Sequence, residues 1–179
     1  ADGPVEFGGR TWTDRRLVTH LKTIEDGRRR EFLELLAPTG AIDTSVGRAH
    51  LEQWLDAGLE VGNHTWDHPC LDRCDTSEQR HQILKTHTYL TGLLGAPPTL
   101  FAYPNGDVTG AAKSALREAG YALALAFDHR LADLSADRYE MSRLRIDSDA
   151  PDDRFRAILS GAHSAFFHAR AGLRRVVGR

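Results

Sequence analysis

The hydrophobic positions of the chain follow two spacings, one typical of helices and the other typical of strands. Apolar residues at intervals of three and four predict helices, whereas short continuous apolar runs predict buried strands. Helical spacing begins near Trp12 and stops at Pro38 and Gly40, which predicts two N-terminal helical pieces. Residues 1–10 contain four glycines and prolines and little that could pack, so we expect a loop there.

Capping residues mark the boundaries of the helices in the middle of the chain. Asp75 and Glu78 resemble a capping box, and Gly95 lies where a left-handed C-cap would end the same helix. Thr109 can cap a further helix, which Gly120 closes. The predicted helices cover residues 46–57, 75–94 and 109–119.

Short apolar runs between these helices predict strands over residues 59–62, 99–103, 121–127 and 141–146. A C-terminal helix is predicted from Pro151 to about Val177, with a break near Gly161. Alternating helices and strands predict an α/β fold with a mostly parallel sheet, in a single domain of residues 1–179. Four parallel strands cannot close a barrel, so we expect helices over one edge or strands upstream of residue 1.

The composition is that of an ordinary globular protein and argues against several functional classes. Of the 179 residues, 41% are hydrophobic and 27% are charged. The net charge of -2 argues against nucleic-acid binding, and the arginines at 28–30 and 174–175 are interpreted as solvated helix faces. No run approaches the roughly 18 apolar residues that cross a membrane, and no signal peptide is visible. The compartment stays open, and uncovered sheet edges would allow self-association.

Two histidines four residues apart, His64 and His68, follow the predicted strand 59–62. Imidazole is the commonest neutral metal ligand, and two of them at this spacing can bind one ion. A catalytic zinc usually has three protein ligands and a water. The zinc protease pattern does not fit, because Thr65 stands where it requires glutamate and Pro69 opposes a continuing helix.

Two other interpretations of this pair stay open. Two of the nine histidines could lie in one loop by chance. Alternatively, His64, His68, Cys70 and Cys74 could together form a closed structural zinc site. Two cysteines are too few for a disulfide framework, and we expect free thiols.

A second loop, with the sequence Phe-Ala-Tyr-Pro-Asn-Gly at residues 101–106, ends the next predicted strand. Pro104 fixes the backbone, and Gly106 allows conformations that other residues resist. A rigid turn of this kind can point the N–H of Asn105 at a developing oxyanion, although an ordinary strand-ending turn explains the same residues. Both loops follow predicted parallel strands, where active sites of α/β folds lie.

Together the two loops resemble the polysaccharide deacetylase family, which includes chitin, peptidoglycan and exopolysaccharide deacetylases. The resemblance rests on Gly-Asn-His-Thr-x-x-His-Pro at residues 62–69 and on the loop at 101–106, and it extends from about Trp54 to Ile146. The Trp-Thr-Asp-Arg sequence at residues 12–15 is similar to a segment of one bacterial branch. The resemblance implies a distorted (β/α) barrel and a divalent metal, usually zinc.

The resemblance also implies roles for single residues. His64 and His68 correspond to the two metal-binding histidines, and Thr65 corresponds to the residue that steadies their loop. Asn105 takes the position whose backbone N–H helps to hold the oxyanion. The residues implied to line the sugar groove are Tyr103, Trp66 and Pro104.

Three features of the family are absent from the matching positions. The Asp-Asp pair that supplies the general base and the third metal ligand has no counterpart here, so we expect an N-terminally incomplete barrel. The family's arginine falls at Ala102, and Arg145 is our hypothesis for its replacement. No histidine follows the last strand as general acid; Asp147 is the candidate there, beside the alternative of a helix cap.

The implied function is metal-dependent hydrolysis of N-acetyl groups of a polysaccharide or an amino sugar, with release of acetate. Because the base and the third ligand are not among these residues, we expect weak metal binding and little activity. The alternative is a catalytically inactive carbohydrate-binding or scaffold domain with the same fold. A carbohydrate is the expected partner in either case.

Overall fold

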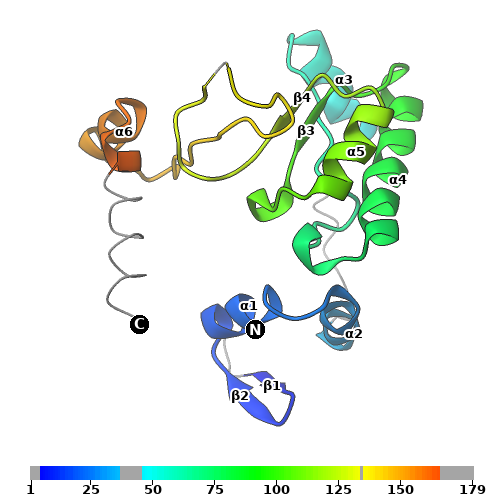
Figure 1. The fold of residues 1–179 in the computed structure, drawn as a ribbon, viewed down its shortest axis with the longest axis vertical. Coiled ribbons are helices and arrows are strands. Elements are labelled where there is room, and N and C mark those ends of the chain that lie inside the picture. The colour runs from blue at the N-terminus through cyan, green and yellow to red at the C-terminus, as the bar shows by residue number, and fades with distance from the viewer. Residues whose placement is uncertain (1–4, 37–45, 134, 166–179) are drawn as a thin grey trace.

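The structure is a computed structural model, and it describes residues 5–36, 46–133 and 135–165. Figure 1 shows the chain from its N-terminal hairpin to the last described helix. The strands are β1 (Val5–Phe7), β2 (Arg10–Trp12), β3 (Leu100–Ala102) and β4 (Leu123–Leu125). The α-helices are α1 (Asp14–Leu21), α2 (Asp26–Leu36), α3 (Arg48–Asp56), α4 (Thr76–Leu94), α5 (Gly110–Glu118) and α6 (Asp152–Leu159). Two short 3-10 helices are η1 (Leu71–Arg73) and η2 (Pro104–Gly106).

A small parallel sheet lies at the centre of the fold. Strands β3 and β4 pair in parallel, with Phe101 opposite Ala124. Single parallel bridges extend the sheet on both sides, from Asn63 to Phe101 and from Leu125 to Met141. The chain therefore passes through this sheet four times in one direction, which confirms the predicted α/β class with parallel strands.

The two outer passes are shorter than predicted. Residues 59–62 and 141–146 were expected to be strands. Residues 59–62 form no bridge and only the next residue, Asn63, does, whereas residues 141–146 contribute one bridge, at Met141. On one side the chain turns at Thr65, which has a φ angle of 67°. On the other side the neighbouring pass beyond β4 turns at His129, with a φ angle of 59°. Each of these left-handed residues ends the extended backbone on the C-terminal side of its own pass.

The helices α4 and α5 pack on one side of the sheet, and the predicted caps form as expected. Asp75 accepts a hydrogen bond from the Glu78 N–H at 2.8 Å, and Gly95 ends α4 with a φ angle of 75°. The hydroxyl of Thr109 caps α5 by accepting from the Ala112 N–H at 3.1 Å. The main core lies between these helices and the sheet and contains Leu71, Ile83, Phe101, Tyr103, Ala112, Ala115, Leu116, Tyr121, Ala124 and Tyr139.

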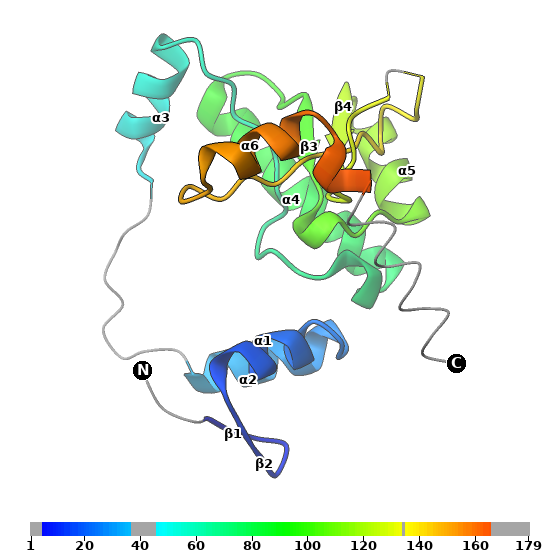
Figure 2. The same cartoon turned by 90° about the vertical axis from the view of Figure 1, so that its left-hand side faces the viewer.

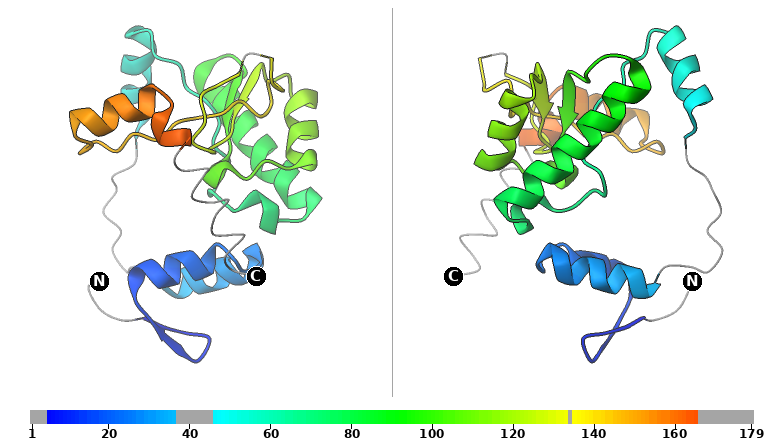
Figure 3. Two further views of the ribbon diagram at one scale, coloured as in Figure 1. Left: turned by 60° about the vertical axis from the view of Figure 1, so that its left-hand side comes forward. Right: turned by 90° about the vertical axis from the view of Figure 1, so that its right-hand side faces the viewer.

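The N-terminal segment forms a hairpin rather than the expected loop. Strands β1 and β2 pair in antiparallel fashion, and Gly8 and Gly9 between them both have positive φ angles, 59° and 72°. Two such residues form the turn that matches the twist of paired strands, so the loop prediction was wrong for residues 5–10, while residues 1–4 lie outside the described residues. Behind the hairpin, α1 and α2 enclose a second small core of Leu17, Leu21 and Phe32. Figures 2 and 3 show these elements beneath α4 and α5.

The remaining helices lie at the periphery. The predicted apolar stripe of α3 is not buried, because Trp54 is 44% exposed and Leu55 is 40% exposed. Helix α3 therefore contributes no residue to the core. Helix α6 ends at Leu159 and Gly161 has a φ angle of 78°, which confirms the predicted break. The predicted stop at residues 38–40, the C-terminal helix beyond residue 165 and the arginines at 174–175 lie outside the described residues.

Within the described segments, none of the helices combines the length and the apolar character that crossing a membrane requires.

Candidate active site

The two histidines lie in a tight loop that follows the bridge at Asn63. Thr65 and His68 have φ angles of 67° and 54°, a backbone conformation that residues other than glycine rarely adopt. The turn brings the ring centroids of His64 and His68 to 4.8 Å, with an angle of 78° between the rings. The structure therefore places side by side the two imidazoles that the sequence paired.

Asn63 anchors the start of this loop in the core. Its side chain is almost fully buried, and its amide nitrogen donates to the Ile83 carbonyl at 3.0 Å and to the Tyr121 hydroxyl at 2.6 Å. Its amide oxygen accepts from the Thr65 N–H at 2.8 Å. Burial raises the pKa of Tyr121 to about 12, so this hydroxyl stays protonated. A buried amide with partners on both atoms fixes the backbone from which the histidines project.

Helices α4 and α2 hold the loop from the other side. The side-chain oxygen of Gln82 on α4 accepts from the backbone N–H groups of Trp66 and Asp67, both at 3.1 Å. Arg30 on α2 forms ion pairs with Asp67 at 2.5 Å and with Glu78 at 2.7 Å. The prediction of a solvated arginine face was therefore wrong for Arg30, because carboxylates of three segments surround it.

The imidazole of His64 is oriented by the neighbouring strand. Its Nδ1 atom lies 2.6 Å from the carbonyl oxygen of Ala102. A carbonyl can only accept, so Nδ1 carries the proton and the lone pair of Nε2 is left for a ligand. Burial lowers the pKa of His64, and the nearby charges of His68 and Arg143 act in the same direction. The hydrogen bond to Ala102 acts in the opposite direction on this pKa, but burial and the two charges outweigh it and favour the neutral imidazole that a metal ion requires.

Part of a metal site fits these residues. Two imidazoles within 4.8 Å of each other, one already oriented through its second nitrogen, are suitable donors for zinc. The hydroxyl of Thr65 beside them is buried without a hydrogen-bond partner. Among the described residues, no group of three or more histidines, cysteines and acidic residues could hold a metal ion. The structure thus contradicts the four-ligand zinc site of the two histidines and two cysteines.

The two cysteines are free thiols, as predicted. Cys70 is buried and accepts a hydrogen bond from the side-chain nitrogen of Asn105 at 3.4 Å, so it connects the histidine loop to the second loop. Cys74 lies near the carboxylates of Asp26 and Glu78, and burial raises its pKa to about 12.

The second loop forms the 3-10 helix η2 directly after β3. Pro104 is buried, and Asn105 has a φ angle of 53°. Gly106 has a φ angle of 86°, and a Cβ atom there would lie 2.6 Å from the Cβ of Phe127. Only glycine tolerates both the conformation and the close approach. The loop that carries Asn105 is therefore rigid, as the sequence predicted, and it lies against the segment after β4.

Two of the residues implied to line a sugar groove are buried instead. Tyr103 is 0% exposed, and its hydroxyl donates to the Tyr139 carbonyl at 2.8 Å. Pro104 also lies in the core. The strand alternates its side chains, so Tyr103 faces the helices with Phe101 rather than a groove. The prediction that Tyr103 and Pro104 line the groove is contradicted by their burial.

Trp66, which lies between the two histidines in the sequence, presents its ring at the surface against α4. It is 45% exposed, and its ring lies 5.6 Å from that of Tyr89 on α4, at an angle of 85°. The ammonium of Lys85 lies 4.1 Å from the Trp66 ring centroid. An exposed aromatic ring at this place could stack against a sugar.

The two polar residues proposed for the last strand lie in a surface ion-pair cluster. The guanidinium of Arg145 is 61% exposed and pairs with Asp147 at 2.7 Å. Asp147 also pairs with Arg154 at 3.3 Å. In this arrangement Arg145 is directed to a surface carboxylate, and Asp147 is held between two arginines.

Arg143 is the residue that the sequence reasoning missed. Its guanidinium carbon lies 5.2 Å from the centroid of the Phe127 ring, and its Nε is buried without a hydrogen-bond partner. Its charge contributes to the low pKa of His64. The alternation of polar and apolar residues at Ser142, Arg143 and Leu144 could have indicated that Arg143 faces away from its neighbours in the strand. The face that each side chain takes, however, depends on the register of the sheet.

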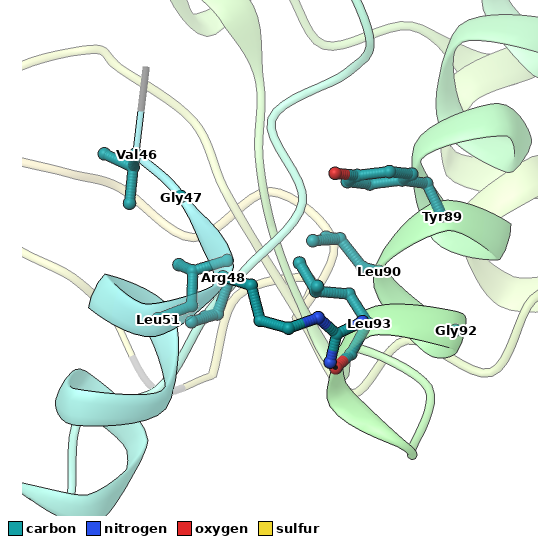
Figure 4. A pocket seen from close by; sticks show the side chains of 9 residues that line it. Val46, Gly47, Arg48, Leu51, Tyr89, Leu90, Gly92 and Leu93 are labelled. Carbon is teal, nitrogen blue, oxygen red and sulfur yellow. Dashed lines mark hydrogen bonds between the residues drawn. The ribbon is translucent and has the colours of Figure 1, made fainter. Parts of the chain in front are cut away.

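A pocket lies away from these loops, between α3 and the C-terminal half of α4 (Figure 4). Its volume is about 680 Å³, and Arg48 reaches across it to the Leu93 carbonyl at 3.3 Å. Neither histidine lines it. Its lining residues are Val46, Gly47, Arg48, Leu51, Val61, Tyr89, Leu90, Gly92 and Leu93.

Comparison with known proteins points to one family. Residues 39–124 match the family model described as polysaccharide deacetylase. The chain is 36% identical over 67 residues to the peptidoglycan-N-acetylmuramic acid deacetylase PdaC of Bacillus subtilis. It is 43% identical over 54 residues to the peptidoglycan-N-acetylglucosamine deacetylase PgdA of Listeria monocytogenes. These matches cover 37% and 30% of this chain but only 14% and 12% of the relatives.

Solved structures show the same fold. The deacetylase PplD of Streptococcus pyogenes, in complex with acetate, superposes with a TM-score of 0.59 at 17% identity, over 65% of this chain and 51% of that one. A de-N-acetylase from Aggregatibacter actinomycetemcomitans superposes with a TM-score of 0.56 at 15% identity, over 68% and 58%. The parallel strands and flanking helices of this chain therefore correspond to part of the barrel of these proteins.

Proposed function

Since the chain belongs to the polysaccharide deacetylase family, we propose that it hydrolyses N-acetyl groups of a glycan in a metal-dependent reaction. The products are acetate and the free amine of the sugar. The observation that carries this proposal is the pairing of His64 with His68 at the carboxyl end of a parallel strand, with His64 oriented by Ala102.

His64, through Nε2, and His68 would hold the metal. A bound divalent ion such as zinc polarises the acetyl carbonyl and makes water more acidic. The chain itself orients the imidazole of His64. The Ala102 carbonyl keeps the proton on Nδ1 of His64, and Asn63 fixes the backbone at the start of the histidine loop. Such outer contacts keep a ligand in one tautomer and one direction.

The η2 loop would stabilise the negative charge of the transition state. Asn105 lies in a left-handed conformation within a loop that Pro104 and Gly106 make rigid. A backbone N–H held in advance of the reaction stabilises an oxyanion without reorganisation. The hydrogen bond from Asn105 to Cys70 connects this loop to the histidine loop, so both groups would act on one substrate.

Trp66 would bind the sugar. Its exposed ring lies two residues from His64 and is supported by Lys85 and Tyr89. Because the relatives are described as peptidoglycan deacetylases, we propose N-acetylated amino sugars of a bacterial cell-wall glycan as the substrate class.

A second candidate function is carbohydrate binding without catalysis. It is favoured by one observation: within the described segments, no third metal-binding side chain joins the two histidines. The exposed Trp66 would serve this function equally well. The two candidates differ in whether acetate is released.

The test is an assay of acetate release from N-acetylated peptidoglycan fragments, with added zinc and with a chelator. Because a third ligand and a base are not among the described residues, we expect only weak release, which depends on zinc, which His64→Ala and His68→Ala abolish and which His50→Ala, on the exposed helix α3, leaves unchanged. Release that is equal in all variants would contradict the role of the pair. Binding of the fragments without release would favour the second candidate.

A further inference from the structure

The backbone of the histidine loop is held by the side chains of two buried amides. The side-chain oxygen of Asn63 accepts from the Thr65 N–H at 2.8 Å. The side-chain oxygen of Gln82, on α4, accepts from the next two N–H groups, those of Trp66 and Asp67, both at 3.1 Å. Both amide side chains are almost fully buried. Three consecutive N–H groups, which belong to no helix or strand, therefore depend on core side chains for their acceptors.

The neighbours of Gln82 determine which end of its amide faces the loop. Its side-chain nitrogen donates to the carboxylates of Asp67 at 3.2 Å and of Glu78 at 2.9 Å. Arg30 on α2 forms ion pairs with the same two carboxylates. An ionised carboxylate can only accept, so the nitrogen of Gln82 must face these groups and its oxygen must face the loop.

The segment that Gln82 holds lies between two strained residues. Thr65 and His68 have φ angles of 67° and 54°, a conformation that is costly for any residue with a Cβ atom. Such strain persists only where the surrounding contacts impose it. Without the acceptor of Gln82 the backbone between His64 and His68 could relax, and the distance of 4.8 Å between the two ring centroids would change.

We infer that Gln82 is a positioning residue that sets the relative placement of His64 and His68, on which their joint binding of a metal ion depends. Gln82 acts through the backbone of the loop and is not itself a ligand. The loss of outer contacts that orient metal ligands typically weakens metal binding tenfold or more. The inference rests on the proposed function for the identity of the ligand, whereas the placement of the two rings requires no metal.

Gln79 provides a matched control, one turn earlier on the same helix. It is also buried, and its side-chain nitrogen donates to the Cys74 carbonyl at 2.9 Å. Its side-chain oxygen accepts from the Thr109 hydroxyl at 2.5 Å. Gln82→Met and Gln79→Met therefore both remove buried hydrogen bonds of α4, but only Gln82→Met removes the acceptor of the histidine loop.

The first measurement is the zinc affinity of the full chain, in competition with a chromophoric chelator. We expect Gln82→Met to weaken zinc binding about tenfold or more and Gln79→Met to leave it unchanged. The same affinity in Gln82→Met and wild type, or an equal loss in both variants, would overturn the inference.

The second measurement needs no metal. In the wild-type protein without zinc we expect NMR cross-peaks between the ring protons of His64 and His68, and slow hydrogen exchange at the N–H groups of Trp66 and Asp67. Gln82→Met should weaken the cross-peaks and accelerate the exchange, and Gln79→Met should do neither. Rapid exchange of these two N–H groups in the wild type would overturn the inference, and this result is available even if Gln82→Met does not fold.

The two measurements separate the inference from the proposed function. Loss of the ring cross-peaks in Gln82→Met, together with no zinc binding by the wild type, would overturn the metal-dependent function and leave the positioning role. Zinc binding that His64→Ala weakens and Gln82→Met does not would support the metal pair and overturn the role of Gln82.

Discussion

The Nδ1 atom of His64 lies 2.6 Å from the carbonyl oxygen of Ala102, so one hydrogen bond joins the histidine loop to the strand that leads into the η2 loop. Neither loop is positioned by its own residues alone. Asn63 connects the histidine loop to Tyr121 and α4, and Gly106 brings the η2 loop onto Phe127. The predictions below test these connections one at a time.

Replacement of Asn63 should destabilise the whole fold. Asn63→Ala leaves the Ile83 carbonyl and the Thr65 N–H without their partner in the core. We expect a loss of about 2–4 kcal/mol in the free energy of unfolding, measured by urea denaturation. Tyr121→Phe, which removes only one of the partners of Asn63, should cost about 1–2 kcal/mol. A cost below that of Tyr121→Phe would show that Asn63 does not anchor the loop.

Gly106 and Gly92 should respond in opposite directions to alanine. At Gly106 the new Cβ would meet Phe127 at 2.6 Å in a backbone with a φ angle of 86°, so we expect a loss of more than about 2 kcal/mol. At Gly92, inside α4, no atom lies within 4 Å of the new Cβ, and alanine should stabilise by about 0.5–1 kcal/mol. Thermal unfolding of both variants measures the difference. A tolerated Gly106→Ala would mean that the η2 loop is not held against Phe127.

Arg30 should contribute to stability through the histidine loop, whereas Arg28 should not. Arg30→Gln removes ion pairs to Asp67 and Glu78 that connect α2 to the loop and to α4, and one to Asp26, which keeps Arg29 as a partner. Because Arg30, Asp67 and Glu78 are about one-third exposed and Asp26 keeps its pair with Arg29, we expect a loss of only about 1 kcal/mol, which falls as salt is added. Arg28→Gln, on the exposed side of α2, is the matched control. The same stability in both variants would show that the ion pairs of Arg30 contribute nothing.

Cys74 should react slowly with alkylating reagents at neutral pH. Its pKa is raised to about 12 by burial and by the carboxylates of Asp26 and Glu78. Only the thiolate reacts, so the rate at Cys74 should keep increasing with pH well beyond the pKa of an ordinary thiol, near 8.5. Mass spectrometry of peptides after timed alkylation measures this rate, and the protein unfolded in urea serves as the reference. A rate that levels off near pH 9 in the folded protein would contradict the environment described for Cys74.

The helices and their caps could be predicted from the sequence because their signals are local. Asp75 with Glu78, Gly95 and Thr109 occupy their predicted positions. The hairpin was missed although its signal, Gly8-Gly9 between alternating residues, was also local. Both strand ends were predicted as active-site loops, and the structure brings His64 close to His68 there.

Features that depend on tertiary contacts could not be predicted in the same way. Tyr103 was expected in a groove, but the packing of α5 and Tyr139 encloses it. Arg145 and Arg143 differ by two positions and have the same chemistry, and only the contacts distinguish them. Arg145 pairs with Asp147 at the surface, whereas Arg143 packs on the ring of Phe127. Sequence patterns specify the residue type, and the register of the sheet determines its neighbours.

His64 and His68 together bind a metal ion in this account, and a titration with zinc in competition with a chromophoric chelator tests this most directly. The wild-type protein and His50→Ala should bind zinc with the same affinity, and His64→Ala and His68→Ala should each weaken it about tenfold or more. The same zinc affinity in all four proteins would contradict the claim.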